Sequence, residues 1–214
     1  DGRASAMRRF AGIEAKGWAY GQHAIVATVD HEKPHRSIAH ERFLPSGPFA
    51  ILPLRGGHRS SLVWTEKKDL VASFMALEDD AFRGEIADRV GGFLGELSLV
   101  GPRFHHPLGL QVADRYTDHR LALVGDAAHG IHPIAGQGLN LGLRDVAALI
   151  DIVVDAKRHG LDLAHPSGLK RYQRWRRADN MLMAGMTDLL NRLFSNDVPP
   201  IRFARDLGLA AVNR

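Results

Sequence analysis

Several residue types that bind polar ligands lie close together between residues 120 and 142, in the sequence RLALVGDAAHGIHPIAGQGLNLG. Asp126 can accept hydrogen bonds from the hydroxyl groups of a ligand. Gly136 and Gly138 carry no Cβ atom, so a ligand can approach the main chain there, and Pro133 stiffens the loop before them. The segment therefore indicates a binding site for a ligand that presents hydroxyl groups and electron-rich or anionic groups.

The elements on either side must hold these residues in place. Residues 121–124 form an apolar run without alternation, which predicts a strand buried on both faces of a sheet, with Asp126 at its carboxyl end. A helix is predicted from about residue 137 to Lys157, because apolar residues recur at helical spacing. These are Leu139, Leu143, Val146, Ala147, Ile150, Val153 and Val154. Its first turn offers unpaired N–H groups and the positive end of the helix dipole to the ligand.

This ordered string resembles the second flavin-binding motif of the FAD-dependent aromatic hydroxylases of the para-hydroxybenzoate hydroxylase type. The similarity is greatest to their ubiquinone-biosynthesis branch, where GDAAH, then HP, then GQGLN is characteristic. The first residues, DGRASAMR, resemble the Asp-Gly-x-x-Ser-x-x-Arg motif of the same class. The two motifs occur in the expected order, and the resemblance covers nearly all 214 residues.

The resemblance implies FAD as the cofactor and NAD(P)H as the electron donor. Asp126 would bind the ribityl hydroxyls, Pro133 would pack beside the isoalloxazine ring, and the backbone of residues 136–140 would surround its pyrimidine edge. Asp1 and Arg8 would lie near the diphosphate. The expected cofactor-binding residues are Asp1, Arg8, Gly125, Asp126, Pro133, Gly136, Gln137, Gly138, Leu139 and Asn140. The activity implied is hydroxylation of an aromatic ring, a polyprenylated ubiquinone precursor, through a peroxyflavin; no catalytic side chain is assigned.

The chain departs from the family pattern in one respect. Family members begin with a βαβ unit whose G-x-G-x-x-G sequence binds the adenosine diphosphate half of FAD. That sequence does not occur here: in the nearest match, which starts at Gly136, Leu141 occupies the place of the last glycine. We therefore expect a C-terminal fragment of a larger enzyme, inactive by itself.

The predicted fold is α+β to α/β, in three parts. Residues 10–110 would form a substrate domain with an antiparallel-rich mixed sheet, built from strands at 24–29, 37–43, 49–54, 59–65 and 108–113 and helices at 67–77 and 78–93. Residues 1–9 and 111–160 would be the remnant of an FAD-binding α/β domain. Residues 161–214 would be a C-terminal helical segment, with helices at about 166–194 and 201–212.

Composition limits the remaining choices. There is no cysteine and the formal net charge is +4, so disulfides and thiolate metal sites are excluded and no metal is expected. The cluster of basic residues at 170–177 is interpreted as a solvated helix face, so nucleic acid is not an expected partner. No signal peptide or apolar stretch of about 18 residues occurs, which predicts a cytoplasmic protein, with peripheral contact to the inner membrane face or assembly with pathway proteins as further possibilities.

Some alternatives remain open. The methionines of the 166–194 helix are interpreted as core or interdomain packing residues, with a membrane-facing or partner-facing patch as the second interpretation. His129 is expected to be structural, and neither His129 nor His132 is assigned to acid–base chemistry or to a metal. A soluble phenol is the alternative substrate. A non-catalytic scaffold or oligomerisation module is the alternative from another class.

Overall fold

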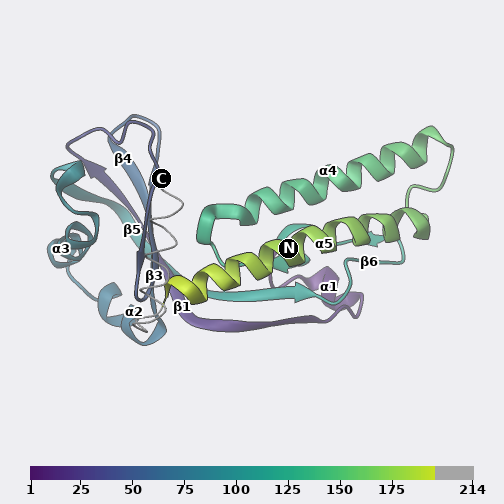
Figure 1. Cartoon of the computed structure of the whole chain (residues 1–214), viewed down its shortest axis with the longest axis horizontal. Coiled ribbons are helices and arrows are strands. Elements are labelled where there is room, and N and C mark those ends of the chain that lie inside the picture. The colour runs from purple at the N-terminus through teal and green to yellow at the C-terminus, as the bar shows by residue number, and fades with distance from the viewer. Residues whose placement is uncertain (196–214) are drawn as a thin grey trace. The chain divides into compact units, whose positions relative to one another are not determined.

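The structure, a computed structural model, describes residues 1–195 and divides into two compact units. Unit 1 comprises Asp1–Tyr20 and Gly109–Leu190, and the described part of unit 2 comprises Gly21–Leu108 and residues 191–195. Two long strands, β1 (Ala15–His31) and β5 (Leu97–Ala113), contribute to both units (Figure 1). The units thus divide at residues 20/21 and 108/109, whereas the sequence placed the boundaries at 9/10 and 110/111. The predicted helix at 201–212 lies outside the described residues.

Unit 2 is built on an antiparallel sheet, as predicted. Strands β2 (His40–Leu44), β3 (Gly47–Pro53) and β4 (Arg59–Lys67) join β1 and β5 in the order β2-β3-β4-β1-β5. Trp64 of β4 lies opposite Phe49 on one side and Ile25 on the other. All three side chains are buried, so this register places one face of each strand in a common core, as the two-residue period of a strand requires.

Two helices cover the core of unit 2. Helices α2 (Lys68–Met75) and α3 (Asp79–Val90) confirm the helices predicted at 67–77 and 78–93. Val71, Phe82 and Ile86 from these helices pack in the same cluster as Trp64. The guanidinium of Arg89 lies 4.1 Å from the centroid of the Trp64 ring, in cation–π geometry.

Unit 1 contains two long helices and short strands. Helices α4 (Gln137–Arg158) and α5 (Pro166–Phe194) confirm both helices that their periodicity predicts. The first helix, α1 (Ala6–Phe10), is short, and β8 (His129–Gly130) pairs antiparallel with β5. Buried residues of α4, α5 and the strands form one core: Ile13, Ala113, Tyr116, Leu123, Ala127, Ala128, Ala148, Ile152 and Tyr172.

The apolar run at 121–124 does not form the predicted strand inside a sheet. Its strand, β7 (Leu121–Ala122), pairs antiparallel with β6 (Thr117–Asp118) in a two-stranded ribbon, and both residues of β7 are half-buried. Leu123 alone is fully buried, in the core under α5. An apolar run indicates burial but not the kind of element that buries it, and here only Leu123 is fully covered.

Helix α4 carries two apolar faces. Leu141, Ala148 and Ile152 are buried against unit 1. About half a turn away, a stripe of five residues is exposed by 38–74%: Leu139, Leu143, Val146, Ile150 and Val154. We call this the α4 stripe. A helix that is apolar on opposite faces is typical of a buried element with a neighbour on each side.

Helix α5 also exposes apolar residues. Met181 and Met186 are each about half exposed and Met183 is partly buried, so Met181 and Met186 do not lie in the core of unit 1; packing between domains, the other part of the interpretation, stays a prediction. Trp175, Leu182 and Leu189 are exposed as well. A helix of this length buries one stripe against its own unit, and Met181 and Met186 lie outside that stripe.

Gly17 and Gly84 give a matched test of the strand pairing. A Cβ atom at Gly17 of β1 would lie 1.9 Å from the carbonyl oxygen of Leu110 in β5, whereas one at Gly84 in α3 would meet nothing within 4 Å. We expect Gly17→Ala to lower the free energy of unfolding by about 2 kcal/mol or more, and Gly84→Ala to raise it by roughly 0.5–1 kcal/mol. Urea denaturation measures both, and equal effects would contradict the close β1–β5 approach.

Candidate functional site

The Asp-Gly motif begins unit 1 and caps helix α1. The Asp1 carboxylate accepts hydrogen bonds from the backbone N–H groups of Ala6 (3.1 Å) and Met7 (3.3 Å) and from the Ser5 hydroxyl. The Ser5 hydroxyl in turn accepts from the N–H of Arg8 at 3.0 Å. Both are N-terminal caps that satisfy otherwise unpaired donors. The spacing of this motif thus has a local structural reason, and Asp1 is exposed beside the helix.

Arg8 joins this motif to the second one. Its side chain is buried and donates to the carbonyl oxygens of Ala127 (2.8 Å) and Arg3 (2.7 Å). Arg3 donates to the carbonyl of Gly109 at 2.8 Å. A Cβ atom at Gly130 would lie 2.8 Å from the Arg3 guanidinium. The start of the chain is therefore bonded to residues more than a hundred positions later. The Arg8 guanidinium is occupied by hydrogen bonds to backbone carbonyl oxygens.

The remaining predicted binding residues form one loop and the start of α4. Gly125 and Gly136 have φ angles of +56° and +59°, in the left-handed region that favours glycine. Asp126, in the 3₁₀ turn η2 (Gly125–Ala127), is exposed. Pro133, Gln137 and Gly138 are half-exposed, and Gly136, Leu139 and Asn140 are exposed. The structure thus gathers eight of the ten predicted residues, from 125 to 140, in one segment.

The main chain at this helix start is open to a ligand. Gly136 is the N-cap of α4, and no side chain caps that end. A Cβ atom at Gly136 or Gly138 would meet nothing within 4 Å, so packing within the described residues does not require glycine at 138. The N–H groups of the first helical turn, the helix dipole and an exposed carboxylate one loop away form a donor and acceptor set that fits a flavin with its hydroxylated side chain.

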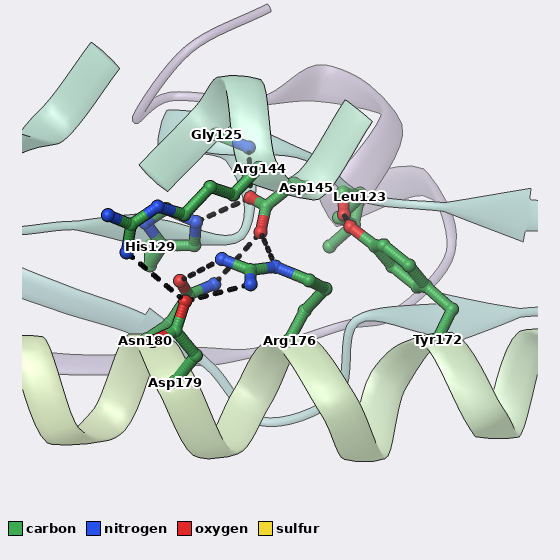
Figure 2. Close-up of polar contacts among 9 residues, drawn as sticks. All are labelled: Leu123, Gly125, His129, Arg144, Asp145, Tyr172, Arg176, Asp179 and Asn180. Atoms are coloured by element: carbon green, nitrogen blue, oxygen red, sulfur yellow. Dashed lines mark hydrogen bonds and ion pairs between the residues drawn. The ribbon is translucent and has the colours of Figure 1, made fainter. Parts of the chain in front are cut away.

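A buried carboxylate lies beneath the loop (Figure 2). Asp145 of α4 is fully buried and accepts four hydrogen bonds. One oxygen, Oδ2, accepts from the Gly125 N–H at 2.9 Å and from His129 Nε2 at 2.6 Å. The other, Oδ1, accepts from Arg176 Nε at 2.8 Å and Asn180 Nδ2 at 3.1 Å. Burial alone would raise the pKa of Asp145, but the hydrogen bonds from His129 and Arg176 outweigh it and hold the pKa below its ordinary value.

Helix α5 supplies the other members of this network. The Arg176 guanidinium also donates to Asp179 at 2.8 Å and to the side-chain oxygen of Asn180 at 3.0 Å. One turn earlier, the Tyr172 hydroxyl donates to the Leu123 carbonyl at 2.7 Å. Sequence reasoning missed Asp145, Tyr172, Arg176 and Asn180. The available signals were an acidic residue among the apolar positions of the buried α4 face, and polar residues four apart on α5.

His132 is a buried neutral imidazole in the same loop. Its Nδ1 accepts from the Ile134 N–H at 3.2 Å, which leaves the proton on Nε2, and the Tyr20 ring lies edge-on at 5.0 Å between centroids. Burial lowers the pKa of His132 to about 4, although the carboxylate of Asp188 opposes this shift. His129 is held by Asp145, which agrees with the structural role expected for it. Within residues 1–195, no group of three or more His, Cys, Asp or Glu side chains is placed to hold a metal ion.

Comparison with known proteins identifies the class. Residues 1–184 match the family described as FAD binding domain, and the chain belongs to that family. It is 57% identical over all 214 residues to the ubiquinone hydroxylase UbiL of Rhodospirillum rubrum, of which it covers 50%. It is 42% identical over 215 residues to the 3-demethoxyubiquinol 3-hydroxylase of Escherichia coli, of which it covers 54%. The chain spans about half the length of the curated relatives it matches.

A solved structure with the same fold is that of PqsL from Pseudomonas aeruginosa in complex with 2-aminobenzoylacetate. The TM-score is 0.75 at 25% sequence identity, and the match covers 92% of this chain and 55% of that chain. The predicted family and fold class are thereby confirmed. No helix among the described residues is long and apolar enough to span a bilayer.

Acid titration tests the buried state of His132. Because its folded pKa lies below the unfolded value, protonation favours the unfolded chain, so its contribution to stability is present above about pH 6.5 and is lost as the pH falls towards about 4. The free energy of unfolding of the original protein should fall between about pH 7 and about pH 4.5. In His132→Asn this fall should be smaller by roughly 2–3 kcal/mol, because no imidazole is left to be protonated. Urea unfolding at both pH values measures the difference, and parallel losses would contradict the assignment.

Proposed function

We propose that this chain forms the flavin-binding half of an FAD-dependent monooxygenase that hydroxylates an aromatic ring, with NAD(P)H as electron donor. The observation that carries the proposal is the segment from Gly125 to Asn140, where an exposed carboxylate precedes an open, uncapped start of a long helix. The match to the FAD binding domain family supports it independently.

Each part of the segment has a proposed role in holding FAD. The Asp126 carboxylate would accept hydrogen bonds from ribityl hydroxyls, and the N–H groups of the first turn of α4 would donate to the pyrimidine edge of the ring. Pro133 would pack beside the ring. Asp1 and Arg8 would support the diphosphate side, Arg8 through the backbone carbonyls that it already holds. Bound FAD would supply oxygen activation, while the protein positions the ring and excludes water.

The α4 stripe supports the idea that this chain holds one half of the cofactor seat. Five exposed apolar residues along one helix face are costly in water. The relatives are about twice as long as the region matched here. We propose that polypeptide corresponding to the rest of these relatives covers the stripe and binds the adenosine end of FAD.

The substrate is proposed from the relatives. UbiL and the Escherichia coli 3-hydroxylase act, by their names, on ubiquinone or its demethoxy precursor, so a polyprenylated aromatic is the first candidate. The exposed Trp175, Leu182 and Met186 of α5 would suit peripheral contact with a membrane that holds such a substrate. A soluble aromatic is the second candidate, since the complex with PqsL contains 2-aminobenzoylacetate.

The decisive experiment uses the complete polypeptide encoded by the gene. We expect it to bind FAD, and Asp126→Ala to weaken binding by roughly tenfold or more, because hydrogen bonds to a charged acceptor are lost. Asp151 is an exposed acidic residue of helix α4, away from the loop that carries Asp126; Asp151→Ala is the control and should bind like the original. FAD titration followed by flavin fluorescence measures each affinity.

The same preparation tests the activity. With NAD(P)H, the protein should consume oxygen in the presence of a prenylated phenol, and faster than with the short-chain analogue after lipid removal. Equal rates on both phenols would favour the soluble substrate. A colourless protein whose spectrum is indifferent to added FAD would contradict the proposal and favour a non-catalytic scaffold.

A further inference from the structure

The positions of the exposed residues in the candidate cofactor site, Gly125 to Asn140, depend on the buried residues that support them. Asp126 is exposed, and the structure shows no hydrogen bond from its side chain to another described residue, so its direction is set by the backbone on either side. The preceding residue, Gly125, gives its N–H to the buried Asp145 carboxylate at 2.9 Å. The Val124–Gly125 peptide, one residue before Asp126, is therefore held by a charge that belongs to neither recognised motif.

A close contact between two glycines makes that bond possible. A Cβ atom at Gly142 would lie 3.4 Å from the Cα of Gly125, and one at Gly125 would lie 3.8 Å from the Cα of Gly142. Residue 142 is one helical turn before Asp145, so the loop crosses α4 directly above the carboxylate. The approach of two main chains explains why the Gly125 N–H reaches a side chain on the helix.

Helix α5 holds the same segment at two points. Tyr172 binds the Leu123 carbonyl, and Arg176 binds Asp145 directly beneath Gly125. Asn180 completes the set one turn later. Residues 172, 176 and 180 are spaced by four, so they share one helix face, which Figure 2 shows directed at the Asp145 cluster. Helix α5, which lies outside both sequence motifs, thus holds Leu123 directly and Gly125 through Asp145.

Stability alone is a weak reason for a charge at this position. A buried ion network can often be replaced by apolar residues with little loss of stability, because removing charges from water is costly. A carboxylate at this site does something that an apolar side chain cannot: it accepts from the Gly125 backbone and from His129 at the same oxygen. We therefore expect the Asp145 carboxylate to serve by fixing the backbone geometry of the loop.

We propose that Asp145, held in place by Arg176 and His129, is a positioning residue for the cofactor: it fixes the Val124–Gly125 peptide, one residue before Asp126, and thereby sets how tightly Asp126 binds the cofactor hydroxyls. This inference rests on the proposed function, because it requires Asp126 to contact FAD. It assigns part of the cofactor affinity to helix α5.

A double-mutant cycle on FAD affinity tests the proposal in the complete polypeptide. The four proteins are the original, Asp126→Ala, Asp145→Asn and the double variant. Asn is nearly isosteric with Asp but is neutral and presents an amide N–H to the donors at one oxygen position. Asp145→Asn should weaken FAD binding roughly 10- to 100-fold. In the Asp126→Ala background the same change should weaken it less than about threefold, because the two residues act in one chain of contacts.

The control and the spectra separate positioning from general destabilisation. Asp151→Asn makes the same chemical change at an exposed position of α4 and should leave affinity unchanged. The absorbance bands of FAD bound to Asp145→Asn, at saturating cofactor, should shift towards those of Asp126→Ala. A structural role alone predicts that Asp145→Asn lowers affinity by the same factor with or without Asp126. That result, or unchanged affinity, would overturn the proposal.

If Asp145→Asn does not fold, Asn180→Ala takes its place in the cycle, since it removes one of the four donors that hold the Asp145 carboxylate and keeps its charge. A several-fold loss of affinity that disappears in the Asp126→Ala background supports the proposal, and an unchanged or background-independent affinity overturns it. Failure of the proposed function gives a different result. In that case the original protein does not bind FAD, or Asp126→Ala binds it with unchanged affinity, and the positioning role of Asp145 is then also rejected.

Discussion

A carboxylate that is removed from water must be surrounded by donors, and this requirement organises unit 1. Asp145 receives donors from the backbone of the loop, from His129 and from two residues of α5. An unpaired charge in this environment would cost several kcal/mol. Loop, α4 and α5 are therefore constrained jointly: displacement of any one of them leaves part of the carboxylate without a partner.

The loop is also held from its other side. Arg8 binds the Ala127 carbonyl, and β8 pairs with β5 through Val112 and His129. Backbone contacts thus fix residues 127–130, while Asp145 and Tyr172 fix residues 123–125. Between them Asp126 is exposed, and farther along the chain Gly136 and Gly138 leave the start of α4 open. A rigid underside with an open outer face is what a site for a large planar cofactor requires.

The sequence predicted the parts of this arrangement that depend on periodicity or on local motifs. Helices α4 and α5 and the antiparallel strands of unit 2 followed from spacings of 3.6 and two residues. The candidate cofactor segment was predicted from its ordered glycines and Asp126, and its role in binding stays a prediction. The run at 121–124 was predicted wrongly because its apolar residues indicate burial and do not distinguish a sheet from a core under a helix. Met181 and Met186 of α5 do not lie in the core of unit 1, and a single helix sequence does not show which of its faces meets which neighbour.

The Asp145 network was missed for a different reason. An acidic residue on the buried face of α4 has meaning only when its donors are known, and these come from residues 125, 129, 176 and 180. The spacing of four relates residues 176 and 180 to each other, but no local pattern relates them to residue 145 or to the loop. The signal in the sequence was negative: Asp145 interrupts an otherwise apolar face between Leu141 and Ala148. Such an interruption is worth examining as a buried charge with distant partners.

Hydrogen exchange at the Gly125 amide tests most directly whether the buried carboxylate organises the cofactor loop. The account predicts slow exchange at this amide, comparable with the core of unit 1, and exchange faster by roughly tenfold or more when Asp145 is replaced by Asn and the charged acceptor is lost. A Gly125 amide that exchanges as fast as an unprotected loop residue in the original protein, or that is unaffected by the substitution, would contradict it.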